Sequence, residues 1–376
     1  MYYSVRRKIR ENSDGSVVDG RTSTLWFASG RCRFSGRCGF LASVHCNLVK
    51  EAVGGNMALR VGFIGAGQIA QVHLKNVQES GLAEVVAVSD IDEQAASVSA
   101  KKFGAIPYFD NVKMLDSEKL DAVFICIPPY NHGQIEEEIV KREINMLVEK
   151  PLGLDMETVQ KKAELIRGSG IIVSTGYCLR YWDIVQEAKQ YLEGKRAALV
   201  NAYYDTRFVS TPWWRQMDKS GGQLVEQTTH IVDLVRYLVG EVTSVHAHMR
   251  LVDSSDIEDL DIYDVGAVNI EFSNGAIGQV RTTFLQPDHR SGAEIMGKGF
   301  RVTVDGGTLT IVDHDGTTTK KSSVDFYREQ DVAFLNAVQT GDRSLILAPY
   351  DEAAKTLAVT LAANQSAKTG QVVELH

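Results

Sequence analysis

The first part of the chain, from Leu59 to Thr175, alternates short apolar runs with segments whose apolar residues recur at helical spacing. Continuous apolar runs are typical of buried parallel strands, and a 3.6-residue period is typical of helices. We therefore expect strands at 59–64, 84–89, 120–127, 145–148 and 171–175, with helices at 68–79, 92–103, 132–143 and 155–168. This alternation predicts an α/β domain with a doubly wound parallel sheet over residues 57–176.

The pattern changes after Tyr177 and becomes richer in β-like runs. Helices are expected at 183–193 and 222–238, and a terminal pair at 326–339 and 350–367. Strands are expected at 197–205, 242–251, 262–272, 276–285, 292–304 and 307–313. Ser273-Asn274-Gly275 is a hairpin signal, because Asn-Gly readily adopts the positive φ angles of a tight turn. Residues 177–376 are therefore expected to form an α+β domain with a large, mostly antiparallel sheet.

A glycine motif, Gly65-Ala66-Gly67-Gln68-Ile69-Ala70, follows the first expected strand and opens the first expected helix. Gly65 permits the sharp turn, Gly67 lets a pyrophosphate approach the backbone, and Ala70 lets helix and strand pack closely. The helix N-terminus offers free N–H groups to phosphates. The motif predicts a Rossmann dinucleotide-binding domain, with contacts from Gly65, Gly67, Gln68 and Ile69. A β-turn-α connection without a ligand is the alternative.

Asp90 ends the second expected strand, where its carboxylate can bind ribose hydroxyls. No Lys or Arg follows until Lys101, so a 2′-phosphate would meet carboxylates, and NAD is predicted rather than NADP. Two further loops are expected at the carboxyl edge of the sheet, where such sheets bind ligands. They supply the predicted cofactor contacts Ile127, Pro128, Asn131, His132, Glu149 and Lys150. His132 could instead cap the helix that follows it.

Candidate chemistry comes from Lys150, Glu226 and His230. A lysine at a strand end beside the cofactor can relay protons, since its pKa shifts readily on burial. Glu226 and His230 are four residues apart, so on one helix they share a face. Histidine is a natural general base near neutral pH. Asp233, three residues past His230, is interpreted as helix surface, with a partner that supports the site as the alternative. Alternatives are a surface salt bridge for Lys150 and a solvated Glu226 beside a structural histidine.

A loop with Trp213, Trp214 and Arg215 combines aromatic faces with a bidentate donor, as in carbohydrate-binding loops. Packing at an interface is the alternative, because Trp and Arg also anchor interfaces. Tyr177 and Arg180 lie at the expected domain junction and are predicted to line the substrate site or to pin the junction.

The chain resembles the Gfo/Idh/MocA oxidoreductase family from about Leu59 to its C-terminus. The resemblance rests on the glycine motif, on Glu149-Lys150-Pro151, on the Gly176–Arg180 segment, and on residues 221–230, GGQLVEQTTH. It implies that Lys150 is the catalytic lysine and that Glu226 and His230 flank the substrate. The family has Asp where this chain has Glu226, which leaves the substrate open.

The resemblance implies an NAD-dependent dehydrogenase of a sugar, sugar derivative or cyclitol. It also implies a homodimer or homotetramer formed through the C-terminal sheet. One alternative is transient oxidation by NAD that allows elimination to cleave a glycoside. Another is a nucleotide-sensing protein without turnover, against which the joint presence of Lys150 and His230 argues.

The composition limits the class of protein and the kinds of partner. Residues are 44% hydrophobic and 23% charged, as in ordinary globular proteins. The net charge of −8 argues against a nucleic acid or membrane partner. Residues 1–56 carry nine Lys and Arg against four Asp and Glu, with three of five cysteines and no sustained periodicity. We expect an extension there, disordered or outside the functional fold, with a basic presequence as the alternative. The cysteines predict neither disulfides nor a metal site, and a cytoplasmic location is expected.

Overall fold

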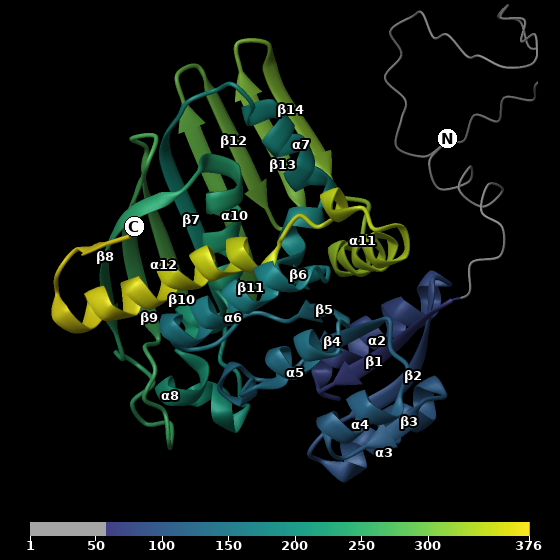
Figure 1. Cartoon of the computed structure of the whole chain (residues 1–376). Helices are drawn as coiled ribbons and strands as arrows, with labels where there is room; N and C mark the ends of the chain where they lie inside the picture. The colour runs from purple at the N-terminus through teal and green to yellow at the C-terminus, as the bar shows by residue number, and fades with distance from the viewer. Residues whose placement is uncertain (1–57, 376) are drawn as a thin grey trace, which may run out of the picture. The chain divides into compact units, whose positions relative to one another are not determined.

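The computed structural model describes residues 58–375, within a compact unit that spans Met57–His376. The predicted extension over residues 1–56 lies outside the described residues. The described part contains two β-sheets with helices packed on them (Figure 1). None of its helices is long and apolar enough to cross a membrane.

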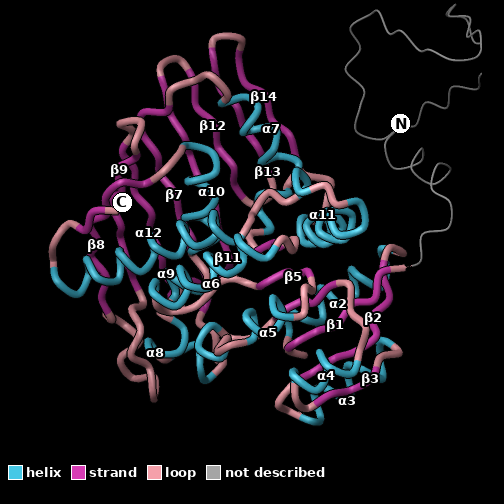
Figure 2. The backbone as a smooth tube through the Cα atoms, viewed as in Figure 1, coloured by secondary structure: helices cyan, strands magenta, loops and turns pink. Residues whose placement is uncertain are grey.

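The first sheet has six parallel strands in the order β3-β2-β1-β4-β5-β6, and mostly helical connections join consecutive strands (Figure 2). This order reverses direction between β1 and β4, which is the point where doubly wound sheets bind dinucleotides. The elements are β1 (Leu59–Ile64), α2 (Gln68–Ser80), β2 (Ala83–Ser89), α3 (Glu93–Phe103), β3 (Ile106–Tyr108), α4 (Asn111–Ser117), β4 (Ala122–Ile125), η2 (Pro129–Asn131), α5 (Ile135–Lys141), β5 (Asn145–Val148), α6 (Met156–Ser169) and β6 (Val173–Thr175).

The second sheet has nine strands in the order β14-β13-β12-β11-β7-β10-β9-β8-β15. All neighbours are antiparallel except β7 and β10. Its strands are β7 (Ala197–Arg207), β8 (Val242–Arg250), β9 (Val265–Phe272), β10 (Ile277–Thr283), β11 (Leu285–Gly297), β12 (Phe300–Asp305), β13 (Thr308–Asp313), β14 (Gly316–Lys321) and β15 (Val373–Glu374). The expected fold class, a Rossmann domain with a mostly antiparallel α+β part, is confirmed.

The remaining helices connect the two sheets. They are η3 (Cys178–Tyr181), α7 (Asp183–Leu192), η4 (Pro212–Arg215), α8 (Met217–Ser220), α9 (Gln223–Glu226), α10 (Thr229–Val239), α11 (Phe326–Thr340), η5 (Arg343–Leu345) and α12 (Tyr350–Thr369). Helices α7, α10 and α12 contact the second sheet, while α11 packs on α2 and α12 also packs on α6. The last two helices therefore fasten the C-terminal part onto the helices of the first sheet.

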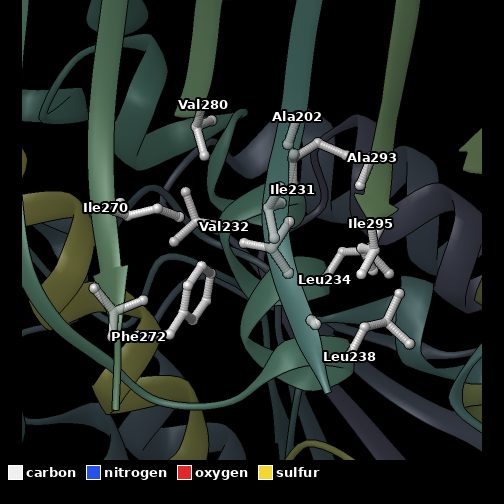
Figure 3. Packing of buried hydrophobic residues seen from close by; sticks show 14 of the residues in the cluster. Ala202, Ile231, Val232, Leu234, Leu238, Ile270, Phe272, Val280, Ala293 and Ile295 are labelled. Carbon is white, nitrogen blue, oxygen red and sulfur yellow. The ribbon is translucent and has the colours of Figure 1, made fainter. Parts of the chain in front are cut away.

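Helix α10 is held by an apolar stripe that faces the second sheet (Figure 3). Ile231, Val232, Leu234 and Leu238 meet side chains of β7, β9, β10 and β11, all at most 9% exposed. Each such side chain contributes about 1.5–3 kcal/mol when fully buried. This packing fixes the first turn of α10, where His230 lies.

The pattern of the sequence misplaced several elements. The helix expected over 222–238 is two helices, α9 and α10, because the N–H groups of Gln227 and Thr228 both bond to the carbonyl of Gln223 and close the first helix. The strand expected over 292–304 is the end of β11 joined to β12 by a tight turn with Gly299 at φ +81°. The pattern did not predict β3, α4 or β14, which are short or polar.

Candidate active site

The glycine motif forms the turn between β1 and α2 as expected. Gly65 has φ +99°, and a Cβ there would overlap the carbonyl of Cys126. A Cβ on Gly67 would meet nothing within 4 Å, so this residue faces open space at the start of α2. The N–H of Ala66 donates to Asp90 Oδ2 at 2.7 Å, which ties the end of β2 to the turn.

A cleft of about 1170 Å³ opens at this edge of the first sheet. It is lined by eight of the predicted site residues, namely Gly65, Gly67, Asp90, Ile127, Pro128, Asn131, His132 and Trp213. Gln68 and Ile69 lie in the first turn of α2, beside the cleft but outside its lining. The cleft has the glycine turn, a helix N-terminus and a carboxylate within one wall, which fits a dinucleotide.

The same cleft has a wall that the sequence pattern did not identify. Phe109 and Val112, after β3, line it with Ile91, and all three are exposed large apolar side chains. Flat apolar surface of this kind suits an adenine ring. Since β3 was not expected, nothing in the sequence pattern placed residues 109–112 at the sheet edge.

His132 lies in the opposite wall and is 3% exposed. Its Nδ1 lies 2.7 Å from Glu136 Oε1, and Glu136 Oε2 accepts a bond from Lys162 Nζ at 2.7 Å. His132 Nε2 has no partner among the described residues. His132 therefore both contacts the following helix and lines the cleft, so neither sequence interpretation excludes the other.

Lys150 follows β5 and reaches across to α9. Its Nζ donates to the backbone oxygen of Glu226 at 2.8 Å and to Glu226 Oε1 at 3.1 Å. The other carboxylate oxygen, Oε2, accepts a bond from Trp214 Nε1 at 2.9 Å. Trp214 is 1% exposed and packs against Phe208 and Phe284. Its predicted role as a stacking surface for sugar is wrong, because its ring is buried in this cluster and its Nε1 holds the carboxylate of Glu226.

The charges of this group are set by its neighbours. Burial lowers the pKa of Lys150, but the carboxylates of Glu226 and Glu149 outweigh that effect and hold the pKa above its ordinary value. Burial, together with the Lys150 ammonium and His289, holds the pKa of His230 well below its ordinary value. At neutral pH the site thus pairs a charged ammonium with a neutral imidazole, whose Nδ1 has no partner among the described residues.

Two residues of the second sheet join this group without having been predicted. Tyr204 on β7 and His289 on β11 place their rings 4.8 Å apart in an edge contact. Burial raises the pKa of Tyr204 to about 12, with opposing effects of Lys150 and Glu226. Tyr204 lies within an expected strand and His289 between two of them, so no local signal distinguished either residue.

Tyr177 and Arg180 make their contacts within the protein. Tyr177 is 1% exposed and its hydroxyl lies 2.9 Å from Thr229 Oγ1, with its ring against the edge of His230. Arg180 forms a bidentate ion pair with Asp233 at 2.8 and 2.7 Å and donates to the carbonyl of Leu347. The interpretation of Asp233 as helix surface is wrong, since it is 1% exposed. Arg180 pins the junction rather than facing a substrate.

The remaining loop residues lie at the rim. Trp213 is half-buried and lines the cleft, with its ring 6.2 Å from that of Tyr130. Arg215 donates to the carbonyls of Ser210 and Glu258 at 3.3 and 3.2 Å, so it ties two loops together. Glu149 is 4% exposed and bonds to His73, so its side chain points away from the cleft.

Two family models match the chain. The one described as an oxidoreductase family with an NAD-binding Rossmann fold covers residues 59–177. The one described as the GFO/IDH/MocA C-terminal domain covers residues 191–310. Together they span more than half of the chain, in the order found in this family.

Relatives agree with these matches. The chain is 27% identical over 337 residues to scyllo-inositol 2-dehydrogenase (NAD(+)) of Bacillus subtilis (strain 168), covering 84% of this chain and 96% of the relative. It is 25% identical over 300 residues to myo-inositol 2-dehydrogenase of Thermotoga maritima, covering 76% and 89%.

Among solved structures, levoglucosan dehydrogenase in complex with NADH matches with a TM-score of 0.78 at 19% identity, covering 85% of this chain and all of that one. GenD2 from gentamicin A biosynthesis, in complex with NAD, matches at 0.75 and 24% identity, covering 86% and 99%. These likenesses show the same fold. The chain therefore belongs to the Gfo/Idh/MocA family and is an NAD-dependent oxidoreductase that acts on CH–OH groups.

Proposed function

We propose that this enzyme oxidises a hydroxyl group of a sugar, a sugar derivative or a cyclitol, or reduces the corresponding ketone. The observation that carries the proposal is the arrangement of three side chains: Glu226 holds Lys150 Nζ at the end of β5, and His230 lies near it in the first turn of α10. These surroundings hold the pKa of Lys150 above its ordinary value and that of His230 below it. Relatives named as inositol dehydrogenases support the substrate class.

His230 is the proposed general base. A neutral imidazole with a free nitrogen can accept the hydroxyl proton, and its depressed pKa keeps that nitrogen unprotonated at neutral pH. Lys150 is the proposed donor to the substrate oxygen, where an ammonium stabilises the negative charge that develops as the proton leaves. Glu226 holds the ammonium through its backbone oxygen and its carboxylate.

The cleft residues would hold the cofactor. The glycine turn and the first turn of α2 suit the pyrophosphate, Asp90 suits ribose hydroxyls, and Asn131 and His132 suit the nicotinamide side. When bound, NAD supplies the acceptor for the hydride that leaves the substrate carbon. Trp213 and Tyr130 at the rim of the cleft are placed to exclude water from a bound substrate.

A screen tests the proposal. Purified protein with NAD is assayed against sugars, cyclitols and glycosides, and both NADH and released aglycone are followed. We expect NADH formation with at least one sugar or cyclitol. Aglycone release without net NADH would replace the proposal with oxidation-assisted glycoside cleavage, and no response to any of the three classes would contradict it.

We also propose that copies of the chain associate through the face of the second sheet away from α10. Leu199 and Ile277 are paired neighbours on β7 and β10 and are 39% and 56% exposed. A solution mass of two or four chains, measured by light scattering and reduced to one chain by Ile277→Lys, is the expected result. A single-chain mass for the unaltered protein would contradict it.

A further inference from the structure

A buried charge cluster lies behind the catalytic group and takes no part in the roles described above. It consists of His73 on α2, Glu149 after β5 and Asp331 on α11. His73 and Asp331 are fully buried, and Glu149 is 4% exposed. His73 Nδ1 lies 2.7 Å from Asp331 Oδ1, and His73 Nε2 lies 3.1 Å from Glu149 Oε1.

Both ring nitrogens of His73 face carboxylates, so both must carry a proton if each contact is to be a hydrogen bond. A neutral ring would leave one buried carboxylate against a lone pair. Burial lowers the pKa of His73, but the two carboxylates outweigh it and raise the pKa to about 10. His73 is therefore an imidazolium at neutral pH, held inside the protein by two negative groups.

The Glu149 carboxylate has little freedom to move. Its Oε2 accepts a bond from the backbone N–H of Lys150 at 3.1 Å, while Oε1 faces His73. A Cβ on Gly176 would overlap this carboxylate, so Gly176 leaves the space it occupies. Asp331 is anchored in turn by Asn76 Nδ2 at 2.8 Å. The cluster thus fixes the carboxylate that directly precedes the catalytic lysine.

The groups that face Lys150 come from four elements, Glu226 on α9, Tyr204 on β7, His230 on α10 and Cys178 on η3, and from the adjacent residue Glu149. Those that face Glu149 are His73, Asp331, Tyr327 on α11, and the buried thiols Cys126 and Cys178. Among these neighbours of Glu149, apart from Lys150 itself, His73 is the one that can carry a positive charge. His73 is therefore the charged partner that holds the Glu149 carboxylate in this buried site.

We propose that His73 is a positioning residue for the reaction: pinned by Asp331, its imidazolium holds the Glu149 carboxylate in place beside Lys150, and this negative charge helps to keep Lys150 protonated. This inference rests on the proposed function, in which Lys150 acts as an ammonium. It assigns to helix α2, whose first turn serves the cofactor, a second role in setting the charge of the catalytic lysine.

Replacement of His73 by Gln tests the proposal, because Gln keeps an N–H donor but no charge. The Glu149 carboxylate should then lose its charged partner and its fixed orientation. It should therefore stabilise the Lys150 ammonium less, and Lys150 should lose its proton at lower pH. We expect the alkaline limb of the kcat/KM profile to move to lower pH by about 1 unit, the low end of the effect of one nearby charge. The loss should therefore be about 10-fold above that limb and small at neutral pH. NAD affinity should stay within about 2-fold of the unaltered protein, too small a change to count as a lost hydrogen bond.

Three further measurements complete the test. Glu149→Gln mimics protonated Glu149 without touching His73 and should shift the alkaline limb in the same direction, even if the His73 variant does not fold. His314→Gln, on an exposed residue of the β13–β14 hairpin, is the matched control and should leave the profile unchanged. In protein labelled with ¹⁵N-histidine, both ring nitrogens of His73 should be protonated at pH 8.

The results that would overturn the proposal are distinct from those that would overturn the proposed function. An unmoved alkaline limb in either variant, or a neutral His73 ring at pH 8, contradicts the positioning role, whatever the melting temperature does. Full activity of Lys150→Ala contradicts the proposed function instead, while the ionisation of His73 measured by NMR would remain a separate result.

Discussion

Glu226→Asp tests whether the carboxylate of Glu226 works through Lys150. The substitution removes one methylene, so the carboxylate retreats by about 1.5 Å, one C–C bond. In the unaltered protein the carboxylate oxygens lie 3.1 Å from Lys150 Nζ and 2.9 Å from Trp214 Nε1. The shorter side chain can no longer reach both partners. The backbone oxygen of residue 226 keeps its contact with Lys150, so the ammonium loses one of its two anchors.

A hydrogen bond between charged groups contributes about 1.5–3 kcal/mol, which corresponds to about 10–150-fold in rate. We expect kcat/KM to fall by a factor in this range, and by similar factors for two epimeric substrates, because the defect lies in Lys150. Glu157→Asp, on an exposed residue of α6, is the matched control and should retain full activity. Unchanged kcat/KM, or a changed ratio between epimers, would refute the reasoning; the latter would place Glu226 on a substrate hydroxyl.

Four other predictions follow from the site. Lys150→Ala should lower kcat by about 10²–10⁴-fold while NAD still binds, as measured by turnover and by fluorescence titration; turnover like that of the unaltered enzyme would remove Lys150 from the mechanism. With Asp90 at the ribose end of the cleft, kcat/KM should be higher with NAD than with NADP, and the reverse order would contradict this cofactor preference. A chain starting at Met57 should keep its melting temperature and its activity, and loss of either would show that residues 1–56 contribute to the working structure. Because the pKa of His73 is raised to about 10 in the folded state, its stabilisation is complete below about pH 6.5 and declines as the pH rises to 10. The difference in melting temperature between the unaltered protein and His73→Gln should shrink over that range, and a constant difference would refute the assignment.

The sequence by itself determined the parts of the molecule that depend on local rules. A continuous apolar run predicted each strand of the first sheet except β3, which has three residues and is largely exposed. The Gly65–Ala70 motif predicted the cofactor turn because φ +99° at Gly65 and the overlap with Cys126 exclude other residues. Lys150 was a candidate because it follows a strand whose end can be recognised from the sequence, but the resemblance to the family, not its position, favoured it as the catalytic lysine.

The tertiary structure decided which polar side chains meet. His73 and Asp331 are 258 residues apart, and Lys150 and Glu226 are 76 apart, so no periodicity connects them. His73 lies on the buried stripe of α2 with Ala70, Leu74 and Val77. A polar residue on the buried face of a helix indicates that another polar group pairs with it, but the sequence does not identify that group.

The same limit explains the residues that were misassigned. The burial of Trp214 and of Asp233 depends on partners elsewhere in the sequence. Trp214 packs in an aromatic cluster with Phe208 and Phe284, and Asp233 pairs with Arg180. The helix that was expected to carry both Glu226 and His230 is broken, and Lys150 is the group that lies near both of them. Local backbone preferences thus determined the elements and the cofactor turn, while burial and long-range pairing of charges decided which residues act and which only support them.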